Sequence, residues 1–123
     1  EILKLDGNDL ESIPESIGEL CLLRELDVSN NKLNSLPGAI EGILSLERIR
    51  ASSNQIRSLP DMSRLQLLRD LQLTGNSLFA LPDSLPNLIS LTRLDIHNNR
   101  LHKLPLNIGN LAKLRFLNVS SNR

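Results

Sequence analysis

The sequence contains little cysteine and few aromatic residues. Its 123 residues include one cysteine, Cys21, two phenylalanines, and neither tryptophan nor tyrosine. A single cysteine cannot form an internal disulfide, and the cysteine-rich end caps of secreted repeat proteins are missing. No signal peptide and no apolar run of membrane-spanning length is present. We therefore expect a reducing, cytoplasmic setting without insertion into a membrane, and a packed, unreactive Cys21 thiol.

An excess of charge of either sign is also absent. Fourteen lysines and arginines balance fourteen aspartates and glutamates, so the formal net charge is zero. A nucleic-acid-binding protein needs a basic surface that displaces counterions from phosphates. The composition therefore argues against nucleic acid as a partner.

Catalytic motifs are missing as well. There is no glycine-rich phosphate loop and no G-x-S-x-G nucleophile motif. His97 and His102 lie near Asp95, but one falls on a predicted strand and the other beyond the following turn. Metal binding or acid–base catalysis would need further ligands or a nucleophile at a set geometry. We predict solvated histidines, and we expect this segment not to be an enzyme and to hold no cofactor and no metal.

What the sequence does contain is a recurring stretch, which residues 23–33 show most clearly. The alternation of Leu26, Asp27 and Val28 predicts a short strand with one face in a core and one in water. Asn31 follows at a position where a core residue is expected. A buried amide must be hydrogen-bonded, and a turn with unpaired backbone groups offers it both donors and acceptors.

Equivalent asparagines recur along the whole chain, 22 or 23 residues apart. They are Asn8, Asn31, Asn54, Asn76, Asn99 and Asn122. We expect these side chains to form a ladder in which each bonds the backbone of adjacent turns. After each of the first five comes a leucine or isoleucine and then a proline, as in Leu36-Pro37. So many fixed positions at one period indicate a repeat protein.

This period predicts a solenoid of short parallel strands, each followed by an asparagine turn, a proline-containing descent and a short helical or irregular return. A lone repeat cannot bury enough apolar surface to fold, so neighbouring repeats must stack. The repeat boundaries are residues 1–22, 23–45, 46–67, 68–90, 91–113 and a partial unit at 114–123. We expect one domain of about five and a half repeats that is an excerpt of a longer chain.

The stretch resembles the L-x-x-L-x-L-x-x-N-x-L segment of leucine-rich repeats. Its 23-residue length and L-P-x-x-I-G-x-L pattern, intact at Leu104–Leu111, are most similar to the intracellular, Ras-suppressor-like group. The third unit departs from this pattern, since it is one residue short and has no glycine after Pro60. The resemblance implies an α/β repeat fold, a leucine-rich-repeat solenoid curved into a horseshoe arc, with a parallel sheet on its concave face. It also implies a non-enzymatic binding module, whose partners in this group are often small GTPases, phosphatases, or cytoskeletal and polarity proteins.

The residues between the core positions of each strand are expected to line the concave face. The candidate partner-binding residues are Glu25, Asp27, Arg48, Arg50, Asp70, Gln72, Arg93, Asp95, His97, Phe116 and Asn118. The signs of the charges alternate from one repeat to the next. Lateral ion pairs would therefore stabilise the sheet slightly, and they would also form a polar surface suited to a partner of mixed charge.

Three positions leave alternatives open. Arg48 and Arg50 lie near the middle of the array, where they could anchor a partner or be occupied by neighbouring carboxylates. Phe79 stands where other repeats have polar residues. Its ring could be an exposed anchor on the descending edge or lie flat on neighbouring aliphatic side chains.

The sequence therefore predicts a scaffold or interaction module that binds a protein on its concave face. One alternative is that this segment is the recognition domain of a larger signalling enzyme (a kinase, phosphatase or ubiquitin ligase) whose catalytic part lies elsewhere. A purely structural spacer is the third reading.

Overall fold

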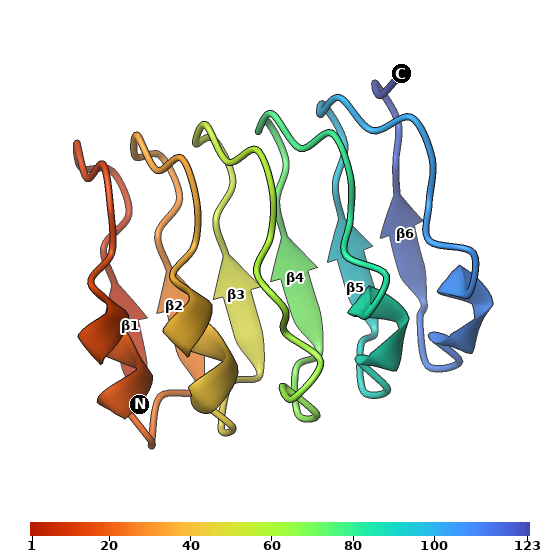
Figure 1. The fold of residues 1–123 in the computed structure, drawn as a ribbon. Coiled ribbons are helices and arrows are strands. Elements are labelled where there is room, and N and C mark those ends of the chain that lie inside the picture. The colour runs from red at the N-terminus through yellow and green to blue at the C-terminus, as the bar shows by residue number, and fades with distance from the viewer.

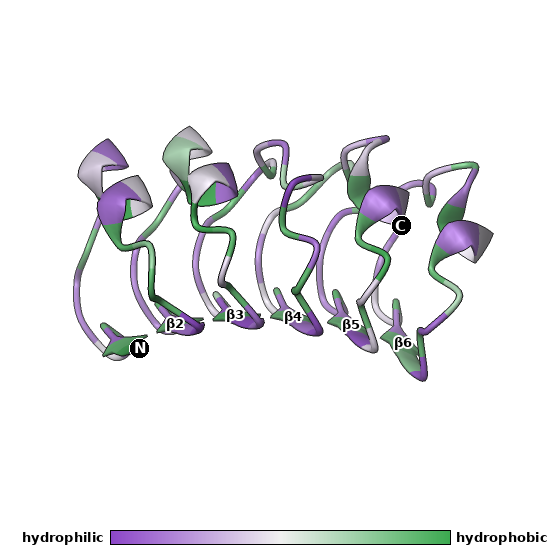
Figure 2. Cartoon of the chain, turned by 90° about the horizontal axis from the view of Figure 1, so that it is seen from below, coloured by the Kyte–Doolittle hydropathy of each residue, from purple (hydrophilic) through white to green (hydrophobic).

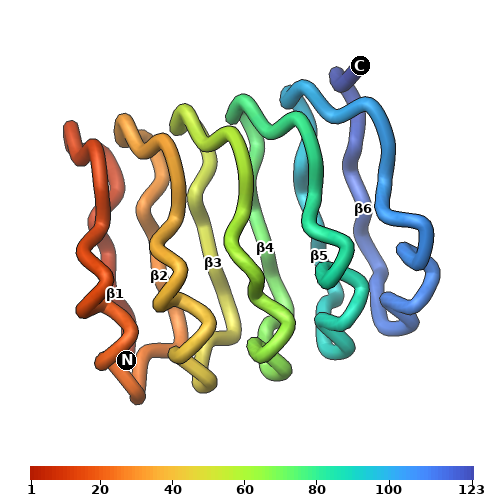
Figure 3. Tube along the Cα trace, in the orientation of Figure 1, coloured from red at the N-terminus to blue at the C-terminus, as the bar shows by residue number.

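Six short strands lie side by side in one parallel sheet, in the order in which they occur in the chain (Figure 1). The computed structural model describes all 123 residues. The strands are β1 (Ile2–Lys4), β2 (Glu25–Asp27), β3 (Arg48–Arg50), β4 (Asp70–Gln72), β5 (Arg93–Asp95) and β6 (Phe116–Asn118). The chain coils from one strand to the next, and its two termini lie at opposite ends of the stack (Figure 3).

The register places equivalent positions of successive repeats next to one another. Asp27 is paired with Arg50, and Arg50 is paired in turn with Gln72. The middle residue of each strand faces the core; Leu26 of β2 and Ile49 of β3 are almost completely buried. The predicted leucine-rich-repeat solenoid with a parallel sheet is therefore confirmed.

Four short 3₁₀ helices lie on the opposite side of the solenoid from the sheet (Figure 2). They are η1 (Glu15–Glu19), η2 (Gly38–Gly42), η3 (Leu85–Asn87) and η4 (Ile108–Asn110). In the first two repeats the proline of the descent is extended and immediately precedes the helix, where its missing N–H costs no hydrogen bond. The shortened third repeat has turns in place of a helix between β3 and β4. None of the helices is long and apolar enough to span a bilayer.

One continuous core of 27 buried hydrophobic side chains runs through the stack between the sheet and the helices. Each fully buried leucine or isoleucine stabilises the fold by about 1.5–3 kcal/mol relative to an exposed one. Cys21 does not belong to this core. Cys21 is exposed, and 73% of the surface of the adjacent Leu22 is accessible as well. The prediction of a packed thiol was therefore wrong. Both residues lie in the convex return, where Leu44 and Ile89, which occupy the position of Cys21 in later repeats, are also exposed.

The chain reverses after every strand through one residue in the left-handed region. This residue precedes the repeat asparagine and has a φ between 54° and 69° in all six repeats. Only two of the six, Gly7 and Gly75, are glycines. A serine or asparagine in this conformation costs about 1 kcal/mol, so the turn needs other interactions to hold it.

The repeat asparagines supply those interactions. The Asn54 Oδ1 accepts a hydrogen bond of 3.0 Å from the Leu33 backbone N–H in the preceding repeat. Its Nδ2 donates to the Val28 carbonyl of that repeat and to the Ala51 carbonyl of its own, at 3.0 and 3.2 Å. The same pattern recurs at Asn31, Asn76, Asn99 and Asn122. Asn8 differs, because its amide donates only to carbonyls of its own turn.

Replacing Asn54 by leucine tests this ladder. The Leu33 N–H would remain buried without a partner, and the Val28 and Ala51 carbonyls would each lose one of two amide donors. We therefore expect Asn54→Leu to lower the free energy of unfolding by about 2–3 kcal/mol. Asn8→Leu is the matched control, with an expected loss below about 0.5 kcal/mol. Urea unfolding followed by circular dichroism measures both. Equal losses of unfolding free energy in the two variants would show that the hydrogen bonds of Asn54 to the preceding repeat do not stabilise the fold.

A glycine allows the first two helices to pack closely. A Cβ on Gly18 of η1 would lie 2.8 Å from the Ala39 carbonyl oxygen of η2, closer than two such atoms can approach. Because this oxygen belongs to the backbone, relief would require the helices to separate. In contrast, a Cβ on Gly109 of η4 would meet nothing within 4 Å.

We therefore expect Gly18→Ala to destabilise the fold by about 1–2 kcal/mol through this overlap. Gly109→Ala should change stability by less than about 0.5 kcal/mol. Thermal melts of the two variants compare them directly. A Gly18→Ala protein as stable as the Gly109→Ala protein would contradict the close packing of η1 on η2.

Candidate functional site

The concave face consists of the strand residues that flank the buried middle positions, together with the first residues beyond the strands. The row of strands bends gently, with the strands on its inner side (Figure 2). Every sequence-predicted binding residue from Glu25 to Asn118 lies on this face, because each is in or just after a strand of the sheet. Most of these side chains are half-buried, so they are held in place while their polar ends remain accessible.

Ion pairs cross this face from one strand to the next. Arg24 Nη2 lies 2.7 Å from Glu47 Oε1, and Arg48 Nη1 lies 2.9 Å from Glu25 Oε1. The Arg48 Nε also faces Asp70 at 3.4 Å. The hydrogen bond and charge of Glu47 raise the pKa of Arg24 above its usual value. Alternating signs in neighbouring repeats thus produce the lateral pairs that the sequence predicts.

The two central arginines are held very differently. Arg48 is enclosed by Glu25 and Asp70, whereas the Arg50 Nη1 lies 3.9 Å from Asp27 Oδ2, too far for a hydrogen bond. About 38% of the Arg50 side chain is accessible. Of the two arginines, Arg50 is therefore the one that can meet a partner without first breaking a short ion pair.

Asp70 is shared by two arginines. The Nε atoms of Arg48 and Arg93 lie 3.4 and 3.8 Å from its carboxylate, and neither Nε has a hydrogen-bond partner. Gln72 donates to the same carboxylate at 3.0 and 3.2 Å. Asp70 thus sits at the centre of a cationic environment that balances its charge.

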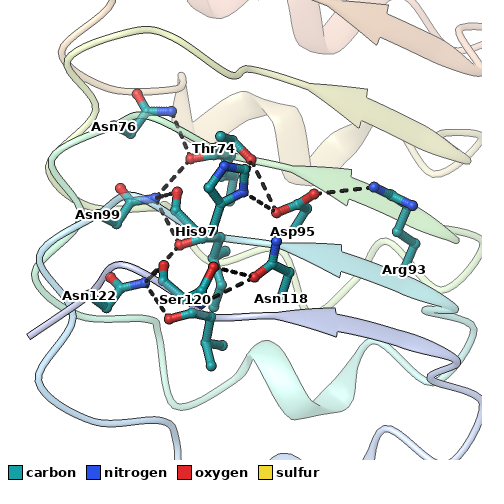
Figure 4. Close-up of polar contacts among 12 residues, drawn as sticks. Thr74, Asn76, Arg93, Asp95, His97, Asn99, Asn118, Ser120 and Asn122 are labelled. Carbon is teal, nitrogen blue, oxygen red and sulfur yellow. Dashed lines mark hydrogen bonds and ion pairs between the residues drawn. The ribbon is translucent and has the colours of Figure 1, made fainter.

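Asp95 is the buried charge of the face, with 8% of its surface accessible. Its Oδ1 lies 2.8 Å from His97 Nδ1 and 3.1 Å from the Thr74 hydroxyl, and Arg93 approaches Oδ2 at 3.2 Å (Figure 4). Burial by itself raises the pKa of Asp95. The hydrogen bonds from the His97 ring, the Thr74 hydroxyl and the His97 backbone outweigh it, so the pKa is lower than usual.

This cluster does not have the geometry of a proton relay. The His97 Nδ1 is the atom that contacts both Asp95 and the Thr74 hydroxyl, at 2.8 and 3.1 Å. A relay needs one ring nitrogen on the carboxylate and the other on the nucleophile. Nor does any group of three or more histidine, cysteine or acidic side chains converge as metal ligands would. The arrangement stiffens a polar surface.

Phe116 adds the one aromatic ring of the concave face. Its ring centroid lies 4.0 Å from the Arg93 guanidinium carbon, within the range of a cation–π interaction. About 38% of Phe116 is exposed. The ring and the arginine together form a flat, partly apolar surface next to Asp95.

Comparisons with known proteins agree with this geometry. Two family models, both described as leucine-rich repeat, match residues 1–56 and 90–111. The ectodomain of the receptor kinase SOBIR1 from Arabidopsis thaliana is 33% identical, with a TM-score of 0.85, over 98% of this chain and 68% of that structure. The chain belongs to the leucine-rich repeat family.

Two further structures are similar to this chain over part of their own length. The plant peptide hormone receptor RGFR1, solved in complex with RGF2, is 34% identical with a TM-score of 0.86, over 98% of this chain and 20% of that one. The Leptospira interrogans protein LIC12759 is 28% identical with a TM-score of 0.80, over 98% of this chain and 37% of that one. The present chain thus spans only a fifth to a third of these two proteins. No curated protein sequence matches it.

The leucine-rich repeat fold also brings Phe79 and His102 together with four residues that the sequence analysis did not select. Six residues that follow the repeat asparagines line a hollow at the edge of the sheet: Arg57, Ser77, Phe79, Arg100, His102 and Arg123. Phe79 is 57% exposed, so much of its side chain is accessible to a partner. Aligning the positions after each asparagine, as was done for the strands, would have revealed this column of basic residues.

The lowered pKa of Asp95 predicts a pH dependence of stability. A carboxylate with a lower pKa in the folded state stabilises the fold above its usual pKa near 3.9, and this contribution is lost as the pH falls towards the folded value. Thermal midpoints of the wild type and Asp95→Asn should therefore differ most above about pH 5 and converge below about pH 3. Comparing the two proteins cancels the other carboxylates. A difference that stays constant across this range would show that Asp95 ionisation is not coupled to folding.

Proposed function

We propose that the concave face of this leucine-rich repeat domain binds a protein or peptide partner. The observation that carries the proposal is Arg50, which lies at the middle of the face, is accessible, and has only a distant carboxylate neighbour. Arginine is enriched among the residues that dominate interface energies, and such residues lie near the centre of an interface.

The surroundings of Arg50 suit this role. Nearby side chains on the same face are half-buried and held by ion pairs and hydrogen bonds, so the surface loses little conformational freedom on binding. Charges of both signs alternate over the face, which favours a partner of mixed charge over a strongly charged one. Two similar structures are complexes, RGFR1 with RGF2 and PEPR1 with AtPEP1, which supports a peptide or protein as the partner class.

The repeat type supports a narrower proposal. The 23-residue period and the L-P-x-x-I-G-x-L pattern suggest the Ras-suppressor-like group. On that resemblance the domain would work in the cytoplasm as a non-catalytic scaffold for a small GTPase, a phosphatase, or a cytoskeletal or polarity protein.

A second candidate is a recognition domain within a larger signalling enzyme. The similar SOBIR1 structure is the ectodomain of a receptor kinase, which favours a kinase among the enzyme classes. In both candidates the present segment binds its partner through the concave face and takes no part in catalysis.

Reversing the charge of Arg50 tests the proposal. Because its nearest carboxylate is 3.9 Å away, Arg50→Glu should change stability by less than about 1 kcal/mol. It should weaken the binding of a partner captured on the wild-type domain by at least about ten-fold. Capture from cell lysate followed by titration of the captured protein measures this.

Arg64→Glu is the control for this experiment. Arg64 is exposed between β3 and β4, away from the sheet, and makes no ion pair. It should leave affinity unchanged. A partner that binds the Arg50→Glu protein as tightly as the wild type would remove the centre of the concave face from the binding site.

A further inference from the structure

Four basic side chains surround an exposed aromatic ring on the edge of the solenoid that follows the asparagine turns. We call this edge the asparagine rim; it is the upper edge in Figure 1, where the C-terminus lies. The basic cluster consists of Arg57, Arg100, His102 and Arg123, which with Ser77 and Phe79 line a hollow of about 430 Å³.

Stacking of the repeats brings these residues together although they are up to 66 positions apart in the chain. The Phe79 N–H donates to the Arg57 carbonyl in the preceding repeat at 3.4 Å. The N–H groups of Arg100 and Arg123 likewise donate to carbonyls of the repeat before them at 2.9 Å. The backbone positions from which the basic side chains extend are therefore fixed.

The basic cluster lacks the partners that the concave arginines have. No carboxylate lies within 4.0 Å of any of its four side chains, whereas Arg48 and Arg93 each have two. Placing like charges side by side without counterions is unfavourable. On the concave face, by contrast, Arg48 and Arg93 are neutralised by neighbouring carboxylates.

Charge is also segregated along the rim. The equivalent positions at its N-terminal end are Asp9 and Glu11, and Lys32 of the next repeat pairs with Asp9 at 2.9 Å. The chain as a whole has no net charge, yet its rim is acidic at one end and basic at the other. The basic side chains at that end are not paired with carboxylates.

We propose that the basic cluster and Phe79 dock an acidic peptide segment of a protein partner. Residues two repeats apart, such as Arg57 and His102, are separated by about 10 Å at the spacing of neighbouring strands. One carboxylate or one phosphate cannot span that distance, so the ligand must carry several anionic groups in a row. The exposed Phe79 ring offers an apolar contact between them.

A peptide fits this surface better than a nucleic acid does. The basic stretch covers only part of the rim, and a longer polyanion would run on towards Asp9 and Glu11, which repel it. The basic cluster also lies on the edge of the solenoid, apart from the concave face. The two surfaces can therefore bind different parts of one partner, or two partners, and this docking site goes beyond the function proposed above.

Binding of a short fluorescein-labelled oligoglutamate peptide, measured by fluorescence anisotropy at low salt, tests the proposal. We expect Arg57→Glu combined with Arg100→Glu to weaken binding at least about ten-fold, with an unchanged melting temperature because both side chains are exposed. Lysine at both positions should retain most of the affinity. Wild-type binding should weaken as salt is added.

A control protein makes the result specific. Arg64→Glu with Lys113→Glu introduces the same charge change at exposed, unpaired sites outside the rim. This variant should bind the peptide within about two-fold of the wild type. The proposal is overturned if the peptide does not bind or if the Arg64 and Lys113 variant loses as much affinity. It is also overturned if a single-stranded oligonucleotide binds more tightly than the peptide through the same two arginines.

Discussion

The hydrogen bonds of the repeat asparagines fix the spacing on which the rest of the structure depends. Each of the five ladder asparagines after Asn8 accepts from a backbone N–H of the preceding repeat and donates to carbonyls on both sides, as Asn54 does. An amide is the side chain that can satisfy donors and acceptors at once in a buried place. It also holds a left-handed residue, such as Ser53, that would otherwise be unfavourable.

Once the repeats are held at one spacing, every equivalent position becomes a lateral neighbour. On the concave face this produces opposite charges at hydrogen-bonding distance, as for Arg48 and Glu25. On the asparagine rim the same spacing gathers Arg57, Arg100 and His102 without any carboxylate among them. One geometric rule thus creates a neutralised surface and an unneutralised one, and the difference between them lies only in which residues occupy each column.

Much of the fold and part of the candidate site could be predicted from the pattern of residues. The strand positions, the register of Asp27 with Arg50 and the alternating ion pairs follow from the period, because a repeat solenoid converts sequence spacing into spatial adjacency. The packing of single side chains did not follow. Cys21 was expected to be buried and is exposed, because apolar residues at its position in the convex return, such as Leu44, are not covered by the core.

The distances between the side chains of the candidate site could not be predicted from the sequence either. Arg48 and Arg50 look alike in sequence, yet one has a 2.9 Å ion pair and the other a contact of 3.9 Å. That difference depends on the rotamers through which Arg48 reaches Glu25 and Arg50 approaches Asp27. The pKa of Asp95 is likewise set by burial and by hydrogen-bond donors from two residues, Thr74 and His97, which have to converge on the carboxylate in space before they act.

By itself, the sequence determined the repeat, the strand faces and the columns of side chains, because apolar periodicity and obligatory hydrogen bonding leave one way to stack such units. Only the tertiary structure decided which charges are neutralised, which aromatic ring is exposed, and where unpaired arginines meet. These properties depend on distances of a few tenths of an ångström to a few ångströms between side chains of different repeats, and a one-dimensional pattern does not contain such distances.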